Sequence, residues 1–486
     1  MSSIVPVTVA YGDGIGPEIM EAVMKILKEV EVPIRVETIE VGEKLYKKNY
    51  SSGISEDTWE SIGRTKVLLK APITTPLGGG YKSLNVTLRK RLGLYANVRP
   101  SIAYFPFVET MYPNMDLVIV RENEEDIYAG IEYRQTHNMY SSLKLISEIG
   151  SEKIIRYAFE YAVKNNRKKV SCFSKDNIMK FSDGIFHKVF TRVSEEYKNI
   201  ESNHFIIDIG TAKLANNPEM FDVIVTSNLY GDIISDVASE VSGSVGMAGS
   251  SNIGEKYAMF EAVHGSAPDI AGQNIANPSG LLNAAIMMLV HIGHGSYAAT
   301  VENAWKKTIE DGIHTGDIYD EKQSSRKVGT KEFADAIVKN LGAKPSKLGA
   351  VSYPDKKVEA ASARTYSIKS ITTEKKVLVG VDVFFDLDSH SAAKIADKLN
   401  ALDCGNLALK TIASKGLKLW PSDEDIETLS DHWCCRFMHK KDAESITHKD
   451  ISNLLEILSE HKWDFIKIEN LYNFDSNRGY SLAQGE

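Results

Sequence analysis

Short apolar runs alternate with amphipathic stretches along residues 1–342 of the chain. The runs of strand length are VPVTVA at 5–10, DLVIVRE at 116–122, KKVSCF at 168–173 and FDVIVTSN at 221–228. Stretches 19–30 and 232–241, which follow two of these runs, repeat apolar residues every three or four positions, as helices do. Strands that alternate with helices predict an α/β fold whose sheet is mostly parallel.

The periodic pattern fades over residues 343–375, which are rich in Ser, Thr, Lys and Ala and which we interpret as a linker. It returns over residues 376–486 as strand, helix, strand, strand, helix and strand, and we expect Ser389 to open the first of these helices. This order predicts a C-terminal α+β domain of the ferredoxin-like βαββαβ type. Residues 1–342 then form the main region of the chain.

Composition is that of an ordered protein with a sizeable core, because 43% of the 486 residues are hydrophobic and 25% are charged. The net charge of −8 and the lack of a long basic run argue against a nucleic-acid partner. The longest mostly apolar stretch, 281–292, is too short to span a membrane. The N-terminus lacks the basic flank and apolar core of a signal peptide, so we expect a cytoplasmic protein.

Several motifs that could carry chemistry fail on spacing. The four cysteines are too few for a disulfide framework, and the adjacent pair Cys434 and Cys435 lacks the usual gap between zinc ligands. In GDGIGPE, Pro17 stands where a Rossmann motif needs its third glycine, so we interpret residues 12–18 as a tight turn into a helix. In PLGGGYKS, Tyr81 stands where a phosphate loop needs glycine.

Three aspartates form a candidate metal site. Asp232 and Asp236 are four residues apart at the start of a predicted helix, so both side chains lie on one helix face. Like charges at that spacing repel each other, and a hard divalent cation would relieve the repulsion. Asp208, at the end of the run HFIID, could supply a third oxygen ligand. The simpler alternative is that Asp232 only stabilises the positive end of the helix dipole.

Three arginines indicate a site for carboxylate groups. They are Arg89, Arg99, which precedes Pro100, and Arg121, which ends the apolar core of the run 116–122. A guanidinium at the end of a strand is suited to bidentate capture of a carboxylate. Arginines and aspartates on one α/β frame together suit a multiply charged acid bridged to a metal ion.

Long ordered segments of the main region resemble the isocitrate/isopropylmalate dehydrogenase family. They are ITTPLGGGYKSLNVTLRK at 73–90, LYANVRP at 94–100, RENEEDIYAGIEY at 121–133, NLYGDIISD at 228–236 and HGSAPDIAGQNIANP at 264–278. The resemblance covers residues 1–342. It implies oxidation of a 2-hydroxy acid by a nicotinamide cofactor, followed by loss of the β-carboxylate.

The resemblance also assigns the substrate residues. Ser83 and Asn85 match the positions that hold the γ-carboxylate of isocitrate, where isopropylmalate enzymes present an apolar surface. Arg89, Arg99 and Arg121 match the substrate-carboxylate clamp. These matches favour conversion of isocitrate to 2-oxoglutarate and CO₂. Homoisocitrate or 3-isopropylmalate dehydrogenase activity stays open, because one methylene changes binding by only about 1–3 kcal/mol. An inactive binding scaffold of the same fold is the remaining alternative.

Metal, catalytic and partner residues follow from the same resemblance. Asp208, Asp232 and Asp236 match ligands of Mg²⁺ or Mn²⁺. Lys175 matches the lysine that assists deprotonation of the hydroxyl, and Tyr128 matches the tyrosine that protonates the enol carbon. Active sites of the family are built across a dimer, and the counterparts of Lys175, Asn177 and Asp208 come from the partner chain. We therefore expect a homodimer or a larger homo-oligomer.

The cofactor contacts are expected in the segment 264–278. Family contacts match Glu261, near the nicotinamide end, and His264, Gly265, Ser266, Ala267 and Asn277. Asp269-Ile270 stands where NADP-preferring bacterial relatives carry Lys-Tyr. A carboxylate accepts hydrogen bonds from a ribose 2′-OH and repels a 2′-phosphate, which predicts NAD in preference to NADP. Lys322, Arg326 or Lys327 could still reach a phosphate.

Residues 376–486 lie outside the main resemblance and carry no catalytic pattern. They resemble the extra C-terminal domain of some longer bacterial family members. We expect a role in assembly or stability, with ligand sensing as the alternative.

Overall fold

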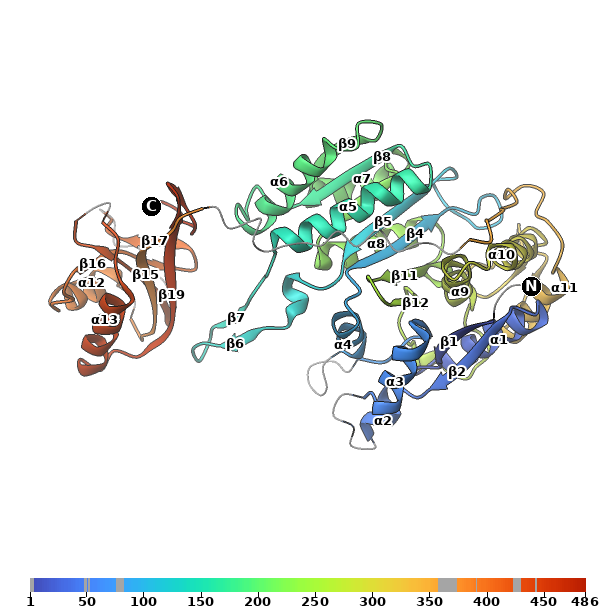
Figure 1. Ribbon diagram of the computed structural model, residues 1–486, viewed down its shortest axis with the longest axis horizontal. Helices are drawn as coiled ribbons and strands as arrows, with labels where there is room; N and C mark the ends of the chain where they lie inside the picture. Colours follow the sequence, from blue (N-terminus) through green and yellow to red (C-terminus); the bar gives the residue numbers. More distant parts are fainter. Residues whose placement is uncertain are drawn as a thin grey trace. The chain divides into compact units, whose positions relative to one another are not determined.

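The computed structural model describes residues 4–47, 50, 53–75, 83–356, 374–389, 391–422, 430–441 and 444–486. The chain divides into two compact units, Met1–Tyr128 with Leu145–Arg364, and Ala129–Lys144 with Thr365–Glu486. The first unit is built on a ten-stranded sheet and the second on a six-stranded sheet (Figure 1). Residues 76–82 and 357–373, parts of the glycine-rich segment and of the predicted linker, lie outside the described residues.

The large sheet has the strand order β2-β1-β3-β12-β11-β4-β5-β10-β8-β9. In that order the strands are Ile34–Ile39, Val5–Ala10, Val67–Lys70, Ala258–Ala262, Gly249–Ile253, Ala96–Ile102, Asp116–Glu122, Val223–Thr226, Lys169–Ser174 and Glu201–Ile206. Neighbours run parallel except at β12-β11, β11-β4 and β4-β5. The predicted α/β fold with a mostly parallel sheet is therefore confirmed.

Helices cover both faces of this sheet. They are α1 (Gly16–Glu29), α2 (Glu43–Lys47), α3 (Glu56–Thr65), α4 (Leu84–Arg91), α5 (Glu148–Lys164), α6 (Ser182–Ser194), α7 (Ile207–Asn216), α8 (Asn228–Val241), α9 (Ser279–His291), α10 (Gly295–Glu310) and α11 (Thr330–Lys339). Strand side chains alternate between two cores, as a pleated strand requires. Leu69 of β3 packs with α1 and α9, for example, whereas Leu68 packs with α3 and α4.

The apolar stretch 281–292 is a core helix. It forms most of α9, whose Leu281, Leu282 and Leu289 are fully buried in the larger core. Within the described part of the chain, no helix combines the length and the apolar character that a membrane crossing needs.

The segment GDGIGPE forms the expected turn into a helix. Pro17 lies at the start of α1, and Gly12 and Gly14 have positive φ values of 66° and 59°. Gly14 is required for a second reason, since a Cβ there would lie 1.9 Å from the backbone oxygen of Ser266. This close approach holds the first turn against the segment that begins at His264, where cofactor contacts are expected.

The second unit contains an antiparallel sheet of six strands in the order β17-β16-β18-β15-β19-β20. Its elements are β15 (Lys376–Asp386), α12 (Ala392–Asn400), β16 (Leu407–Ser414), β17 (Leu417–Trp420), β18 (His432–His439), α13 (His448–Glu460), β19 (Phe465–Phe474) and β20 (Asn477–Arg478). The prediction of an α+β domain is confirmed, and its ferredoxin-like type is not: β17 and β20 extend the sheet to six strands. Ser391, rather than Ser389, caps α12 by accepting a hydrogen bond from the Lys394 N–H.

A hairpin from the middle of the chain belongs to this second unit. Its strands are β6 (Glu132–Arg134) and β7 (Tyr140–Ser142). Asn138, in the turn, donates from its backbone N–H and its side-chain amide to Asp431, at 3.1 and 3.2 Å. The C-terminal unit therefore binds a segment that directly follows the candidate catalytic residue Tyr128.

Candidate active site

The first turns of α8 bring the predicted arginines and two of the aspartates together. Arg121 of β5 donates to Asp232, and Nη1 of Arg99 of β4 lies 3.2 Å from Asp232 Oδ1 and 3.7 Å from Asp236 Oδ1. The close packing of α8 against Arg121 depends on Gly231, because a Cβ there would lie 2.5 Å from the Arg121 side chain. Cationic and anionic groups thus converge at the end of the sheet, as the sequence predicts.

Electrostatics at this point favour an added anion. Burial and the neighbouring charges of Arg99 and Arg89 lower the pKa of Arg121, which is fully buried. The lowered pKa is about 9, so the guanidinium still stays charged at neutral pH. Arg99 and Arg121 share the half-buried carboxylate of Asp232, and the more exposed Asp236 lies 3.7 Å from Arg99. A di- or tricarboxylate would therefore bind favourably here.

The two aspartates differ in their ionisation. Burial acts to raise the pKa of Asp232, but Arg121 and Arg99 outweigh it and the pKa is lowered. The pKa of Asp236 is raised, first by loss of hydration and also by the charge of Asp232, while Arg99 opposes the shift. Two carboxylates with this mutual repulsion fit the chemistry of a divalent hard cation.

Tyr128 is held over α8 by its own short 3-10 helix, η1 (Asp126–Ala129). The buried carboxylate of Asp126 accepts the Leu229 N–H of α8 at 2.9 Å and the Ile127 N–H at 2.8 Å. The Tyr128 hydroxyl donates to Asp232, and the Arg121 guanidinium lies 4.9 Å from the centre of its ring. Burial raises the pKa of Tyr128, so the phenol keeps its proton at neutral pH.

Lys175 and Asp208 form a separate pair within one chain. Lys175 Nζ lies 2.8 Å from Asp208 Oδ1, and this hydrogen bond lowers the pKa of Asp208. The ligand oxygens of Asp208 do not cluster within 4.8 Å of those of both Asp232 and Asp236. Asn177 lies exposed in the turn after β8. One chain therefore assembles two of the three predicted metal ligands.

A buried ion triad links the substrate and cofactor sides. Glu261 of β12 lies 2.8 Å from Lys70 Nζ and 2.9 Å from the Arg89 guanidinium, and it accepts the Asn252 amide at 2.9 Å. Burial acts to raise the pKa of Glu261, but the two cations outweigh it and lower the pKa far below its ordinary value. Glu261 is fixed as a carboxylate that orients Arg89.

The two residues predicted to select the substrate lie at the start of α4. Ser83 is the N-cap residue, and its hydroxyl makes no cap hydrogen bond. Asn85 Oδ1 is buried without a hydrogen-bond partner within the described part of the chain. Polar atoms in this state are available to a ligand, because a buried polar atom that lacks a partner is costly.

The predicted cofactor loop runs from His264 to Asn277 beside the α1 turn. His264 Nε2 is buried without a partner among the described residues, and burial lowers the pKa of this imidazole. The Ser266 hydroxyl lies 2.8 Å from that of Thr74, and Ala267 has a positive φ of 36°. The loop continues through exposed Gly265 and the short helix η4 (Pro268–Ile270), which carries Asp269 and Ile270.

A second segment joins this loop through Asp317. The Asp317 carboxylate accepts the Asn277 amide at 2.9 Å. Strand β14 (Arg326–Lys327) pairs with β13 (Ile313–His314), and the Lys327 side chain lies beside Gly316, next to Asp317. Lys327 Nζ lies 5.6 Å from the centre of the Tyr319 ring. Lys327 and the Tyr319 ring therefore belong to the same segment as Asp317, which contacts Asn277.

Several residues of the site were missed by the sequence analysis. Asn97 Oδ1 accepts from Arg99 Nε at 2.6 Å, Ser235 accepts from Arg99 Nη1 at 2.7 Å, and Asn228 accepts from Arg121. Asn97 was accessible to pattern reasoning, because residues two apart on a strand share a face. The role of Lys70 could not be predicted, since an isolated lysine in an apolar run gives no sign of a buried partner.

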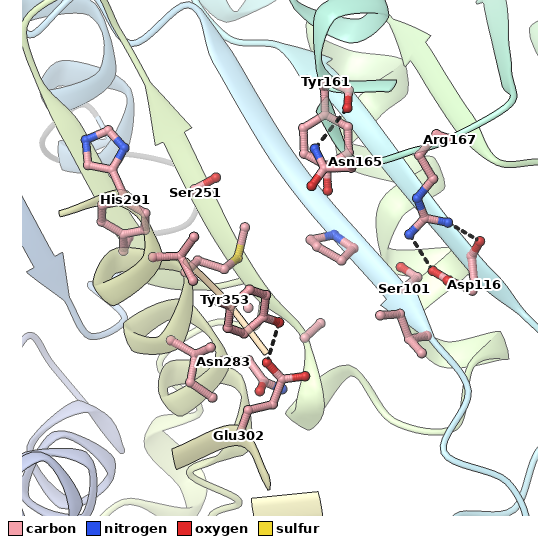
Figure 2. A pocket seen from close by; sticks show the side chains of 18 of the residues that line it. Ser101, Asp116, Tyr161, Asn165, Arg167, Ser251, Asn283, His291, Glu302 and Tyr353 are labelled. Atoms are coloured by element: carbon pink, nitrogen blue, oxygen red, sulfur yellow. Dashed lines mark hydrogen bonds and ion pairs between the residues drawn. The ribbon is translucent and has the colours of Figure 1, made fainter. Parts of the chain in front are cut away.

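A cavity of about 1000 Å³ elsewhere in the first unit does not contain the candidate site (Figure 2). None of the predicted site residues lines it. The lining Arg167 is already paired with Asp116 at 2.6 Å and with Asp222 at 3.0 Å, and Tyr353 donates to Glu302 at 2.7 Å. Arg167 and Tyr353 of this cavity are thus paired with other residues that line it, and they contact none of the predicted site residues.

Comparison with known proteins agrees with this geometry. The isocitrate/isopropylmalate dehydrogenase family profile matches residues 6–337, and the profile of the bacterial isocitrate dehydrogenase C-terminal domain matches 376–486. "Isocitrate dehydrogenase [NADP]" of Rickettsia bellii is 69% identical over 486 residues, all of both chains. The protein of that name from Thermus thermophilus is 41% identical over 99% of this chain and 96% of its own. The crystal structure of TT0538 protein from Thermus thermophilus superposes with a TM-score of 0.90 at 41% identity, covering 99% and 96% of the two chains.

These relatives overturn the predicted cofactor preference. Both carry NADP in their names, so the prediction of NAD in preference to NADP is wrong. The rule based on Asp269-Ile270 considers one local pair, whereas Lys327 lies beside Gly316, next to the Asp317 that accepts the Asn277 amide. The family assignment itself rests on the full length of the chain. The chain belongs to the isocitrate/isopropylmalate dehydrogenase family and carries the C-terminal domain of its bacterial isocitrate dehydrogenases.

Proposed function

We propose that the chain catalyses the metal-dependent oxidative decarboxylation of isocitrate to 2-oxoglutarate and CO₂ with reduction of NADP. The observation that carries this function is the convergence of Arg99 and Arg121 on Asp232 beside the protonated Tyr128. The full-length similarity to proteins named isocitrate dehydrogenase [NADP] supports the same reaction.

The arginines bind and orient the substrate. Arg99 and Arg121 are anchored by Asn97, Ser235 and Asn228, so their guanidinium groups meet the carboxylates with little loss of side-chain entropy. Arg89 is oriented by Glu261. Charge-assisted hydrogen bonds of this kind fix both ends of a multiply charged acid.

Asp232 and Asp236, with Asp208 of a second copy, would hold Mg²⁺ or Mn²⁺. When bound, such a cation lowers the pKa of the substrate hydroxyl and stabilises negative charge that develops next to it. Lys175 of the second copy assists the removal of the hydroxyl proton. Tyr128 then donates its proton to the carbon that has lost the carboxylate, and its raised pKa keeps that proton available.

Ser83 and Asn85 distinguish isocitrate from its relatives. Asn85 Oδ1, which has no partner among the described residues, and the Ser83 hydroxyl, which accepts a 3.4 Å hydrogen bond from Thr75, are polar groups at the place where an alkyl substituent would otherwise pack. Leaving buried polar groups unpaired opposes an alkyl-bearing substrate such as 3-isopropylmalate.

The cofactor occupies the loop 264–277 next to Glu261. His264, Ser266 and Asn277 supply polar contacts, and the unpartnered His264 Nε2 fits a ligand at this loop. Lys327 would balance the 2′-phosphate of NADP, because it lies beside Gly316, next to the Asp317 carboxylate that accepts the Asn277 amide. Tyr319 provides an apolar ring beside it.

A homodimer completes the site. Large apolar side chains are exposed beside the residues that one chain leaves unassembled: Ile178 (68% exposed), Phe181 (48%), Ile209 (49%) and Ile233 (52%). A patch of this kind supports burial against a second copy. Lys175, Asn177 and Asp208 then act in the partner's site.

The second unit serves assembly. The order β16-β18-β15-β19 of its four long strands supports a ferredoxin-like type for this part of the unit. The boundaries 1–342, 343–375 and 376–486 stay predictions, which the profile matches at 6–337 and 376–486 support. The cytoplasmic location likewise stays a prediction.

A substrate panel tests the function. The purified protein is assayed with Mg²⁺, NADP and, in turn, isocitrate, homoisocitrate and 3-isopropylmalate, in the parent and in Asn85→Leu. The parent should favour isocitrate, and Asn85→Leu should lose most of that preference. A parent that turns over 3-isopropylmalate faster than isocitrate would contradict the proposal.

A further inference from the structure

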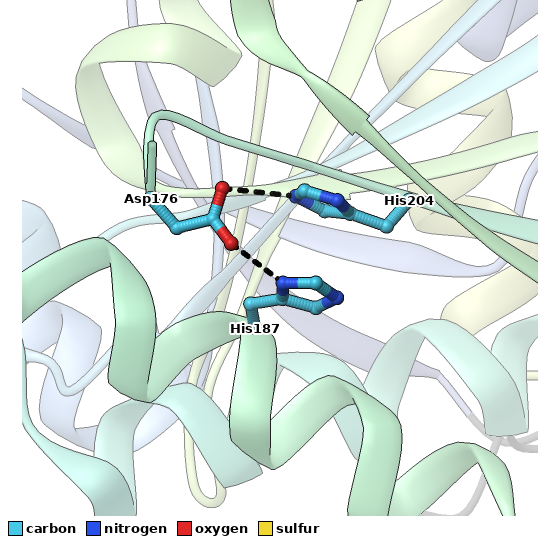
Figure 3. Close-up of side chains that lie close together, drawn as sticks. All are labelled: Asp176, His187 and His204. Atoms are coloured by element: carbon cyan, nitrogen blue, oxygen red, sulfur yellow. Dashed lines mark hydrogen bonds and ion pairs between the residues drawn. The ribbon is translucent and has the colours of Figure 1, made fainter. Parts of the chain in front are cut away.

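A cluster of two histidines and an aspartate lies outside the residues assigned above. Asp176 is in the turn after β8, His204 is on β9 and His187 is on α6 (Figure 3). Their ligand atoms all lie within 4.8 Å of one another, and no other group of three such residues does so in the described ranges. The parallel pairing of β8 with β9 places His204 opposite Cys172, four residues before Asp176.

The contacts inside the cluster converge on the carboxylate. His187 Nδ1 lies 2.7 Å from Asp176 Oδ2, and His204 Nε2 lies 3.7 Å from Asp176 Oδ1. Figure 3 shows both rings with a nitrogen turned toward Asp176. The two rings stack with centroids 3.7 Å apart and planes 15° apart.

This stacking argues against a pair of charged imidazoles, because two cations at that distance repel each other strongly. Burial and the neighbouring His187 also lower the pKa of His204. Neutral imidazole is the form that binds metal ions.

We propose that Asp176, His187 and His204 form a binding site for a borderline divalent transition-metal ion, for which Zn²⁺ is the test case. Two imidazole nitrogens and one carboxylate oxygen are a ligand set that suits such ions, and water fills the fourth position. The donor set differs from the all-carboxylate pair Asp232 and Asp236, which suits the harder Mg²⁺. The two sites are therefore separable by metal type.

Small rearrangements convert the observed cluster into a site. Zinc lies about 2.0–2.2 Å from nitrogen and oxygen ligands, so ligand atoms that now span up to 4.8 Å move by roughly an ångström. The ion takes the place of the proton between His187 Nδ1 and Asp176. His204 Nε2 exchanges its 2.8 Å contact with the Ser174 hydroxyl for the metal. The displaced proton moves to Nε2 of the same ring, so His187 binds as a neutral imidazole.

Occupation would fix the turn that carries two proposed active-site residues. Asp176 lies between Lys175 and Asn177, and the turn is otherwise held by the Lys175 N–H donating to Asp183 at 2.6 Å and by the Ile178 N–H donating to the Lys175 carbonyl. A metal ion there joins the turn to β9 and α6.

Calorimetry with Zn²⁺ alone as the titrant tests the site. The chelator-treated full-length protein is kept in millimolar Mg²⁺, which occupies the carboxylate pair and competes poorly for imidazole. We expect one Zn²⁺ per chain, with affinity at least ten-fold weaker in His187→Gln and in Asp176→Asn. His448→Gln, which alters an exposed histidine of α13, is the matched control and should bind as the parent does. Circular dichroism checks that each variant is folded.

A second measurement does not depend on any variant. Zinc-edge X-ray absorption of the parent with one equivalent of Zn²⁺ should show two imidazole rings in the coordination sphere. A parent that binds no Zn²⁺ under saturating Mg²⁺, variants that bind as tightly as the parent, or a spectrum without paired imidazoles would each overturn the proposal.

Discussion

Neutralising Glu261 should destabilise the first unit strongly. The carboxylate is 5% exposed, and it pairs with Lys70, whose side chain is 1% exposed, and with Arg89 at 10%. Glu261→Gln keeps the size and the hydrogen-bonding capacity of the side chain but leaves two buried cations without a counter-charge. Lys70 would keep only its 3.1 Å hydrogen bond to the Ala71 carbonyl.

The magnitude follows from the burial. Removing one partner of a buried ion pair costs about 3–5 kcal/mol. At about 2 °C per kcal/mol for a unit of this size, the melting temperature should fall by roughly 5–10 °C. Glu29→Gln on the exposed face of α1 is the matched control, for which a change within about 0.5 kcal/mol is expected.

The pH dependence gives a second signature. The folded pKa of Glu261 lies below its unfolded value of about 4.3, so its contribution is fully present above that value and is lost as the pH falls below it. The difference in melting temperature between parent and variant should therefore shrink below pH 4. Thermal unfolding of parent, Glu261→Gln and the double variant with Lys70→Met checks this. A single variant as stable as the parent at pH 7, or a double variant no more stable than the single, would refute the reasoning.

Four further predictions follow from the site. Tyr128→Phe should lower turnover by about 10²–10⁴-fold with an unchanged circular dichroism spectrum, which steady-state rates of NADPH formation check. Lys175→Met and Asp236→Asn should each be inactive alone but regain activity when co-expressed, because a mixed dimer holds one intact site; no recovery would contradict the shared site. Lys327→Gln should raise the KM for NADP about ten-fold and leave that for isocitrate unchanged, as initial rates would show. Arg436→Met leaves buried Asp382 without its 2.8 Å ion pair. Urea denaturation should therefore show a free energy of unfolding of the second unit that is lower by about 3 kcal/mol.

Sequence patterns predicted those features of the fold that depend on residues close to one another in the chain. The alternation of strands and helices, the turn at Gly12 and Gly14 and the shared helix face of Asp232 and Asp236 each depend on residues close in sequence. The convergence of Arg99 and Arg121 on α8 was expected only in outline. Its geometry depends on Gly231, whose missing side chain gives no signal in the sequence beyond the family motif.

Errors arose where distant segments meet. The cofactor prediction gave more weight to Asp269 than to Lys327, although Lys327 was already a candidate for a phosphate contact. The sequence pattern did not predict β17 and β20 of the C-terminal sheet, because short edge strands have too few residues to show a periodic pattern. The cluster of Asp176, His187 and His204 is separated by up to 28 residues, and only the pairing of β8 with β9 and the packing of α6 bring it together.

The most direct test of the account is the initial rate of cofactor reduction with isocitrate and Mg²⁺, measured with NADP and with NAD at matched concentrations while 2-oxoglutarate is quantified. The account predicts faster reduction of NADP, with one 2-oxoglutarate formed for each NADPH. Reduction of NAD alone would contradict the cofactor assignment, and no reduction of either cofactor with isocitrate would contradict the proposed reaction itself.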